Sequence, residues 1–101
     1  MSDHTVPAMF GYFAETFLMT ASELERKKKH LLAFAASQGS EMQAIFTEHL
    51  DTRPAAIESL IQRARREKVT AVAVTAAADL GTQHRRELEE AGIRILIAGP
   101  P

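Results

Sequence analysis

Short apolar runs alternate along the chain with segments in which apolar residues recur at helical spacing. Four of these runs are bounded by Pro, Gly or polar residues, which is typical of strands. The third run, VTAVAVT, is almost continuously β-branched or small and apolar, as in a strand that is covered on both faces of a sheet. The predicted strands cover residues 7–13, 42–48, 69–75 and 93–99.

Three segments between these runs carry the boundary signals of helices. Thr20 and Glu23 have the spacing of a capping box, so the first helix should begin near Thr20. It should end before Gly39, because glycine readily takes the left-handed conformation. The second helix should contain Pro54 in its first turn, where a missing amide costs nothing, and the third should end at Gly92. The apolar stripe of the second helix consists of Ile57, Leu60, Ile61 and Ala64.

The alternation of strands and helices predicts an α/β fold of three layers, with a mostly parallel four-stranded sheet and helices on both of its faces. A chain of 101 residues, of which 46% are hydrophobic, can build one core, so we expect a single domain over residues 1–101. Ligands of such sheets gather at the carboxyl ends of the strands. The segments expected at that edge are residues 13–20, 49–54 and 76–83.

Charge and cysteine content narrow the range of partners. With 12 basic and 13 acidic residues the net charge is −1, which gives no general attraction to nucleic acid or anionic lipid. The absence of cysteine excludes disulfides, thiolate ligands and cysteine catalysis. No apolar stretch approaches the roughly 20 residues of a membrane helix, and the N-terminus does not resemble a signal peptide. We therefore expect a cytoplasmic protein without membrane contact.

The sequence offers no pattern for a metal ion or a nucleotide cofactor. Its 4 histidines are scattered, without the i, i+4 pairing or the neighbouring carboxylates of a metal site. The glycine-containing stretches lack the spacing of a phosphate-binding or dinucleotide-binding loop. We expect neither metal nor cofactor.

Three dipeptides occur in the first predicted strand or at the predicted edge of the sheet, and their order suggests a family. They are Gly11-Tyr12 in the first strand, Arg53-Pro54 at the start of the second helix, and Leu80-Gly81 after the third strand. With this order and spacing, the chain resembles the N-terminal catalytic domain of the serine recombinases, the resolvase and invertase family. The resemblance runs from FGY to IRILIAG and implies a resolvase-like fold. In that family a serine attacks a DNA phosphate that arginines hold.

Most residues that carry this chemistry in the family are replaced here. The motif Gly-Tyr-Ala-Arg-Val-Ser places its arginine on Ala14 and its nucleophilic serine on Thr16. The later motif Leu-Asp-Arg-Leu-Gly-Arg places its two arginines on Asp79 and Thr82. Positioned cations supply most of the barrier reduction in phosphoryl transfer. The resemblance therefore implies a domain without recombinase activity, in which Thr16 and Arg53 are relics of the site.

Family members continue into a long dimerisation helix and a helix-turn-helix domain, neither of which we expect in this chain. The domain alone should therefore not read a DNA sequence. We expect it to act through protein contacts, either as a homo-oligomer such as a dimer or as a regulator of a full-length recombinase or another DNA-associated protein.

The loop after the first strand contains Phe17, Leu18 and Met19 in place of polar residues. Two interpretations remain open. These side chains fill the vacated cleft as ordinary core, or they form an exposed apolar patch of the kind that marks interfaces.

The alternative function is that of a DNA recombination protein or a phosphate-binding enzyme with a residual site. Such a site would combine Thr16 and Arg53 with the amides at the start of the second helix, which favour anions. Ion pairing of Arg53 with Asp51 or Glu48 is the competing explanation for that arginine.

Overall fold

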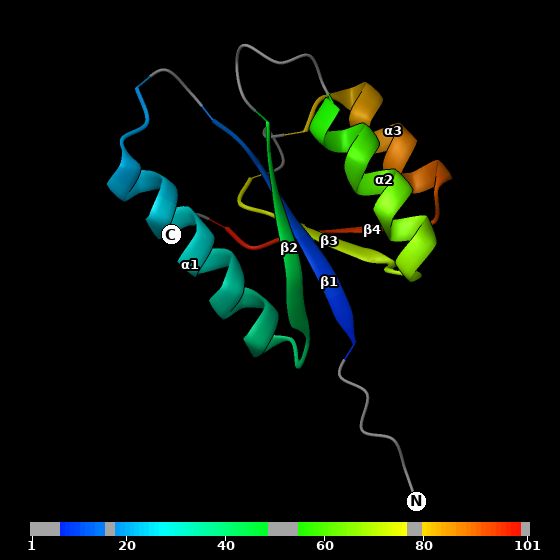
Figure 1. The fold of residues 1–101 in the computed structure, drawn as a ribbon, viewed down its shortest axis with the longest axis horizontal. Coiled ribbons are helices and arrows are strands. Elements are labelled where there is room, and N and C mark those ends of the chain that lie inside the picture. The colour runs from blue at the N-terminus through cyan, green and yellow to red at the C-terminus, as the bar shows by residue number, and fades with distance from the viewer. Residues whose placement is uncertain (1–6, 16–17, 49–54, 77–79, 100–101) are drawn as a thin grey trace, which may run out of the picture.

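Four strands and three helices alternate along the part of the chain that the computed structural model describes, which comprises residues 7–15, 18–48, 55–76 and 80–99 (Figure 1). The strands are β1 (Ala8–Ala14), β2 (Glu41–Glu48), β3 (Ala71–Val74) and β4 (Arg94–Ile97). The helices are α1 (Ala21–Ser37), α2 (Ala55–Glu67) and α3 (Thr82–Glu90). None of these three described helices is long and apolar enough to cross a membrane.

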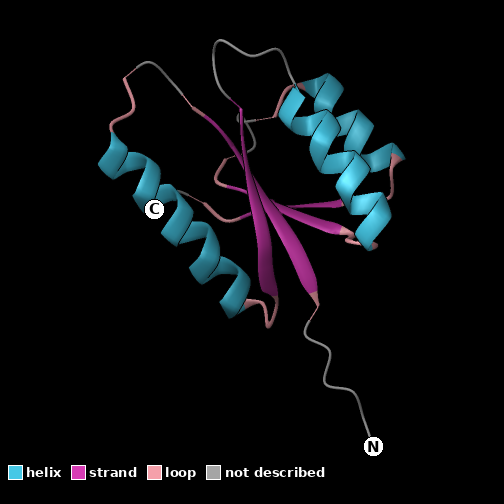
Figure 2. Cartoon of the chain, in the orientation of Figure 1, coloured by secondary structure: helices cyan, strands magenta, loops and turns pink. Residues whose placement is uncertain are grey.

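The strands form one sheet in the order β2-β1-β3-β4, and every neighbouring pair is parallel. Figure 2 shows α1 on one face of the sheet and α2 with α3 on the other. The predicted three-layer α/β fold is thereby confirmed. Because all strands run in the same direction, their carboxyl ends lie along one edge, while β2 and β4 are the two outer strands.

The alternation of side chains along β1 divides the core into two clusters. Phe10 and Tyr12 pack with residues of α2 and α3, whereas Met9 and Phe13 pack with residues of α1, and all four are at most 2% exposed. A central strand of a sheet with helices on both faces is buried in this way. The first cluster also contains Ile57, Leu60, Ala64, Val72, Val74 and Leu88, and the second contains Leu31, Ala35, Ala71 and Ala73.

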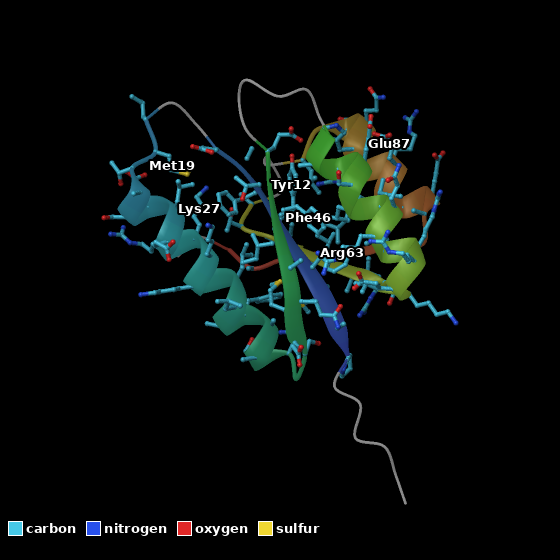
Figure 3. The ribbon with its side chains drawn as sticks, in the orientation of Figure 1. Tyr12, Met19, Lys27, Phe46, Arg63 and Glu87 are labelled. Atoms are coloured by element: carbon cyan, nitrogen blue, oxygen red, sulfur yellow. The ribbon has the colours of Figure 1, made fainter. Side chains whose placement is uncertain are left out.

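Arg63 of α2 covers the first cluster at the side of β2 (Figure 3). Its guanidinium lies 5.5 Å from the ring centroid of Phe10, and its Nε donates to Glu67 at 2.7 Å. Phe10 meets the ring of Phe46 edge to face at a centroid distance of 5.2 Å. This cation therefore stabilises the packing of α2 through a cation–π contact.

The ends of α1 agree with the capping signals of the sequence. The side-chain oxygen of Thr20 accepts a hydrogen bond from the backbone N–H of Glu23 at 3.2 Å. At the other end Gly39 has a φ of 69°, and the N–H of Ser40 donates to the carbonyl of Ala35 at 2.9 Å. This is the Schellman pattern, which satisfies carbonyls that the last turn leaves free.

Strands β3 and β4 are shorter than predicted at both ends, and at their starts the first residues of the apolar runs close the preceding helices. The N–H of Val69 donates to the carbonyl of Ala64 at 2.9 Å, and that of Ile93 to Leu88 at 2.9 Å. The turn after α2 places Lys68 at a φ of 60°, a left-handed conformation that the sequence did not suggest for a lysine.

Candidate functional site

The ends of β1 and β2 form one part of the edge at which ligands were expected (Figure 1). Ala14, the last residue of β1, lies opposite Glu48, the last residue of β2. The N–H of Glu15 donates to the backbone carbonyl of Glu48 at 2.8 Å, so the pairing extends one residue beyond β1. Two half-buried acidic residues therefore adjoin the position at which the family has an arginine.

A buried tyrosine contacts one of these acids from within the core. Tyr12 is 1% exposed, and its hydroxyl donates to Oε1 of Glu48 at 3.4 Å. The other carboxylate oxygen of Glu48, Oε2, is buried and accepts no hydrogen bond from any described residue. An ionised carboxylate can only accept hydrogen bonds. This corner of the edge therefore offers a carboxylate oxygen to a hydrogen-bond donor or a cation.

The structure separates the apolar residues of the loop after β1. Leu18 is 89% exposed, whereas Met19 is half-buried and packs against the second core cluster, beside the start of α1 (Figure 3). The core interpretation thus describes Met19, and the exposed-patch interpretation describes Leu18. Phe17 lies outside the described residues.

A lysine of α1 approaches β1 near this loop. The Nζ of Lys27 lies 5.7 Å from the ring centroid of Phe13, which belongs to the second core cluster (Figure 3). A cation over an aromatic face is stabilised by the ring quadrupole. The Phe13 ring is therefore a structural partner of Lys27. Lys27 itself lies on a helix and not at the end of a strand.

The third part of the edge follows β3. Thr75 is buried at 3% exposure, and Leu80 at 6% exposure belongs to the first core cluster. Gly81 is the residue that caps α3, and Thr82, at a family arginine position, is exposed on the first turn of that helix. Leu80 and Gly81, which contributed to the resemblance, thus have clear roles in packing and in helix initiation.

Several residues on which the sequence analysis relied lie outside the described residues. They are Thr16, Asp51, Arg53, Pro54 and Asp79. The residual site of Thr16 and Arg53, and the pairing of Arg53 with an acid, therefore stay predictions.

The described residues contain no group of three or more His, Asp or Glu side chains that could hold a metal ion. His30 of α1 instead lies with Nε2 at 2.9 Å from the carbonyl oxygen of Gly99 and 3.3 Å from that of Ala98. Carbonyl oxygens only accept hydrogen bonds, so Nε2 acts as the donor. This histidine ties α1 to the chain just after β4.

The contact between Tyr12 and Glu48 was not predicted from the sequence. The available signal was the position of Glu48 at the end of an apolar run, which places a carboxylate at the ligand-binding edge of a parallel sheet. The register that sets Ala14 opposite Glu48 could not be deduced from spacing, because strand pairing joins residues far apart in the chain.

No protein-family profile matches this sequence, and no curated protein matches it either. Among solved structures, the fold is similar to that of the C-terminal catalytic domain of ISC1926 TnpA, an IS607-like serine recombinase, with a TM-score of 0.74. The aligned region covers 92% of this chain and 69% of that chain, at 17% sequence identity. The chain therefore has the fold of a serine recombinase catalytic domain, as the resemblance implied.

Proposed function

We propose that this chain is a catalytically inactive serine-recombinase-like domain that serves as an interaction or regulatory module. The observation that carries the proposal is the acidic end of β1 and β2, where Glu15 and Glu48 adjoin Ala14. Phosphoryl transfer needs cations aimed at the phosphate oxygens. The carboxylates of Glu15 and Glu48 have the same sign of charge as a phosphate and would repel it. A phosphate would be disfavoured here even before the loss of the arginine is considered.

The exposed side chain of Leu18 supports the interaction part of the proposal. Met19 packs against the second core cluster, while its neighbour Leu18 is 89% exposed. A large apolar side chain exposed to water gains free energy when a partner covers it. The expected partner is a protein, such as a recombinase that this domain regulates.

To test the inactivity, the protein is incubated with supercoiled plasmid in a buffer without divalent cations. After denaturation, the amounts of nicked DNA and of DNA bound covalently to protein are measured. We expect neither product. The variant Thr16→Ala is the matched control, since it removes the only hydroxyl aligned with the family's nucleophile. Nicking or a covalent adduct that disappears in Thr16→Ala would refute the proposal and establish the recombination alternative.

The interaction is tested by placing a photo-crosslinking amino acid at position 18 and, as the matched control, at position 32 in cells. Leu32 is also an exposed leucine, at 48%, but it lies on the regular surface of α1. We expect a discrete protein adduct from position 18 and none from position 32. Equal labelling from both positions, or no adduct from position 18, would argue against this loop as an interface.

A further inference from the structure

A groove of about 620 Å³ runs between α3 and the free edge of β4. It is lined by Arg85 and Glu89 of α3 and by residues 92–97, which include all of β4. Within the part of the chain that the structure describes, β4 pairs with β3 on one side only, and the backbone groups on its other side have no strand partner there. Such an edge is a template for the addition of another strand.

The hydrogen bonds to β3 identify which backbone groups face the groove. The N–H of Arg94 donates to the carbonyl of Thr70 and the N–H of Ala98 to that of Val74, each at 2.7 Å. Alternate residues of a strand direct their N–H and C=O groups to the same side. The groups of Ile95 and Ile97 therefore point away from β3, towards the free edge.

β4 is short, at 4 residues, which by itself limits strand addition, but the other features that protect a sheet edge are few. Arg94 is the one charged residue of β4, at its start, and Ile97 at its end is 47% exposed. Protected edges usually carry several charges, a proline or a bulge within the strand. Exposed isoleucine beside unpaired backbone groups favours a partner that is itself an extended apolar strand.

The charges beside the groove are arranged so that they can pair with the same charges of a second copy of α3 that runs in the opposite direction. The first half of α3 carries Arg85 and Arg86, and its last turn carries Glu89 and Glu90. An isologous two-fold contact brings residue i against residue j and residue j against residue i. When two copies of α3 run antiparallel across the groove, Arg85 of each copy faces Glu89 of the other.

The strand pairing is symmetric about the same axis. In an antiparallel pair centred on Leu96, Ile95 of one copy lies opposite Ile97 of the other. Both residues direct their backbone groups outwards, so each such pair can exchange two N–H···O bonds. One two-fold axis thus satisfies the free backbone of β4 and the charges of α3 together.

We infer that β4 pairs antiparallel with β4 of a second copy of this chain, which joins two sheets across a two-fold axis. The inference deepens the proposed function by naming a partner and a surface, and it rests on that function only in taking the domain to act through protein contacts. It requires neither Leu18 nor the acidic residues Glu15 and Glu48 at the ends of β1 and β2.

The first test is sedimentation equilibrium of the full chain over a wide concentration range. We expect a monomer–dimer equilibrium that Ile97→Lys weakens by at least about tenfold in Kd, since a charge on an edge strand opposes pairing. Leu32→Lys is the matched control, because Leu32 is 48% exposed against 47% for Ile97 and lies on α1. It should leave the Kd unchanged. A monomeric wild type, or equal effects of both variants, would overturn the inference.

A second test uses the exposed charges of α3, which do not contribute to the core. Arg85→Glu and Glu89→Arg should each weaken self-association, because each places like charges against one another across the two-fold axis. An equimolar mixture of the two variants should recover association, because residue 85 of one chain then faces an opposite charge at residue 89 of the other. If the substitutions acted only within their own helix, mixing the two variants would not restore association. Failure of the mixture to associate would therefore refute the contact between the two copies of α3.

The outcomes separate this inference from the proposed function. DNA cleavage that depends on Thr16 would refute the proposed function and leave the dimer intact. A strictly monomeric protein that gives the position-18 adduct would refute the β4 pairing alone.

Discussion

Replacing Gly11 by alanine should destabilise the fold, because three neighbours already occupy the space of the added methyl group. A Cβ at this position would lie 3.1 Å from Sδ of Met42, 3.2 Å from Cγ1 of Ile45 and 3.2 Å from Cδ1 of Leu31. Optimal contacts between carbon atoms are about 3.5–4.0 Å. Gly11 thus allows α1 and β2 to approach the middle of β1.

Two opposing effects set the magnitude for Gly11→Ala. Alanine restricts the unfolded chain, which stabilises by about 0.4–1 kcal/mol where the native backbone is compatible. Overpacking of a well-filled core costs about 1–3 kcal/mol. We expect a net loss of about 1–2 kcal/mol in the free energy of unfolding, and a Tm lower by about 5–15 °C, given the usual 4–8 °C per kcal/mol for a domain of this size.

The assay is urea and thermal unfolding followed by circular dichroism, in a double-mutant cycle with Met42→Val. The valine lacks the sulfur that lies nearest the new methyl group. Gly11→Ala should therefore be less destabilising in the Met42→Val background than in the wild type, by about 0.5 kcal/mol or more. A stabilised Gly11→Ala protein, or two changes that simply add, would show that the approach of α1 and β2 does not depend on this glycine.

Three further changes test the local structure by the same unfolding measurements. Lys68→Gly should stabilise by about 0.5–1 kcal/mol, because Lys68 has a φ of 60° that glycine adopts without strain; a loss of stability would contradict the assigned turn. Thr20→Ala should cost about 1 kcal/mol through the lost hydrogen bond to the N–H of Glu23, and no change would mean that the cap contributes nothing. Leu60→Ala should lower the free energy of unfolding by about 2–5 kcal/mol, because Leu60 is fully buried. Leu32→Ala, at an exposed site, should change it by less than about 0.5 kcal/mol. Similar losses in the two variants would contradict the assigned core.

The sequence was a good guide to the elements, because their signals are local. Apolar runs, helical spacing and capping signals identified every strand and helix of the described chain, and the Thr20 and Gly39 caps were correctly predicted. The errors fell at the ends of strands, because β3 and β4 are shorter than predicted at both ends. Val69 and Ile93 are apolar and β-branched, so they resemble strand residues, but their N–H groups close helices. The spacing of apolar residues indicates which side chains are buried. It does not indicate whether a backbone N–H pairs within a strand or closes a helix.

The site was harder to predict because it depends on contacts between distant segments. A loop with adjacent Leu18 and Met19 gives no sign of which side chain faces the core, and the structure assigns opposite environments to the two. The acidic character of the edge arises from register, which sets Ala14 opposite Glu48. Thr16 and Arg53 were selected by resemblance alone and remain to be tested by experiment.

The burial pattern explains how the fold can be shared with a recombinase catalytic domain at only 17% sequence identity. The clusters around Phe10 and Phe13 hold the sheet and helices together, and neither Ala14 nor Glu48, at the ends of β1 and β2, belongs to them. Among the described residues, the large apolar side chains that stay exposed are Leu18, Leu32 and Ile97. Two of these lie on the proposed contact surfaces, on separate elements and outside both clusters. Each surface can therefore be removed by one substitution without loss of the fold, so the two proposals can fail independently.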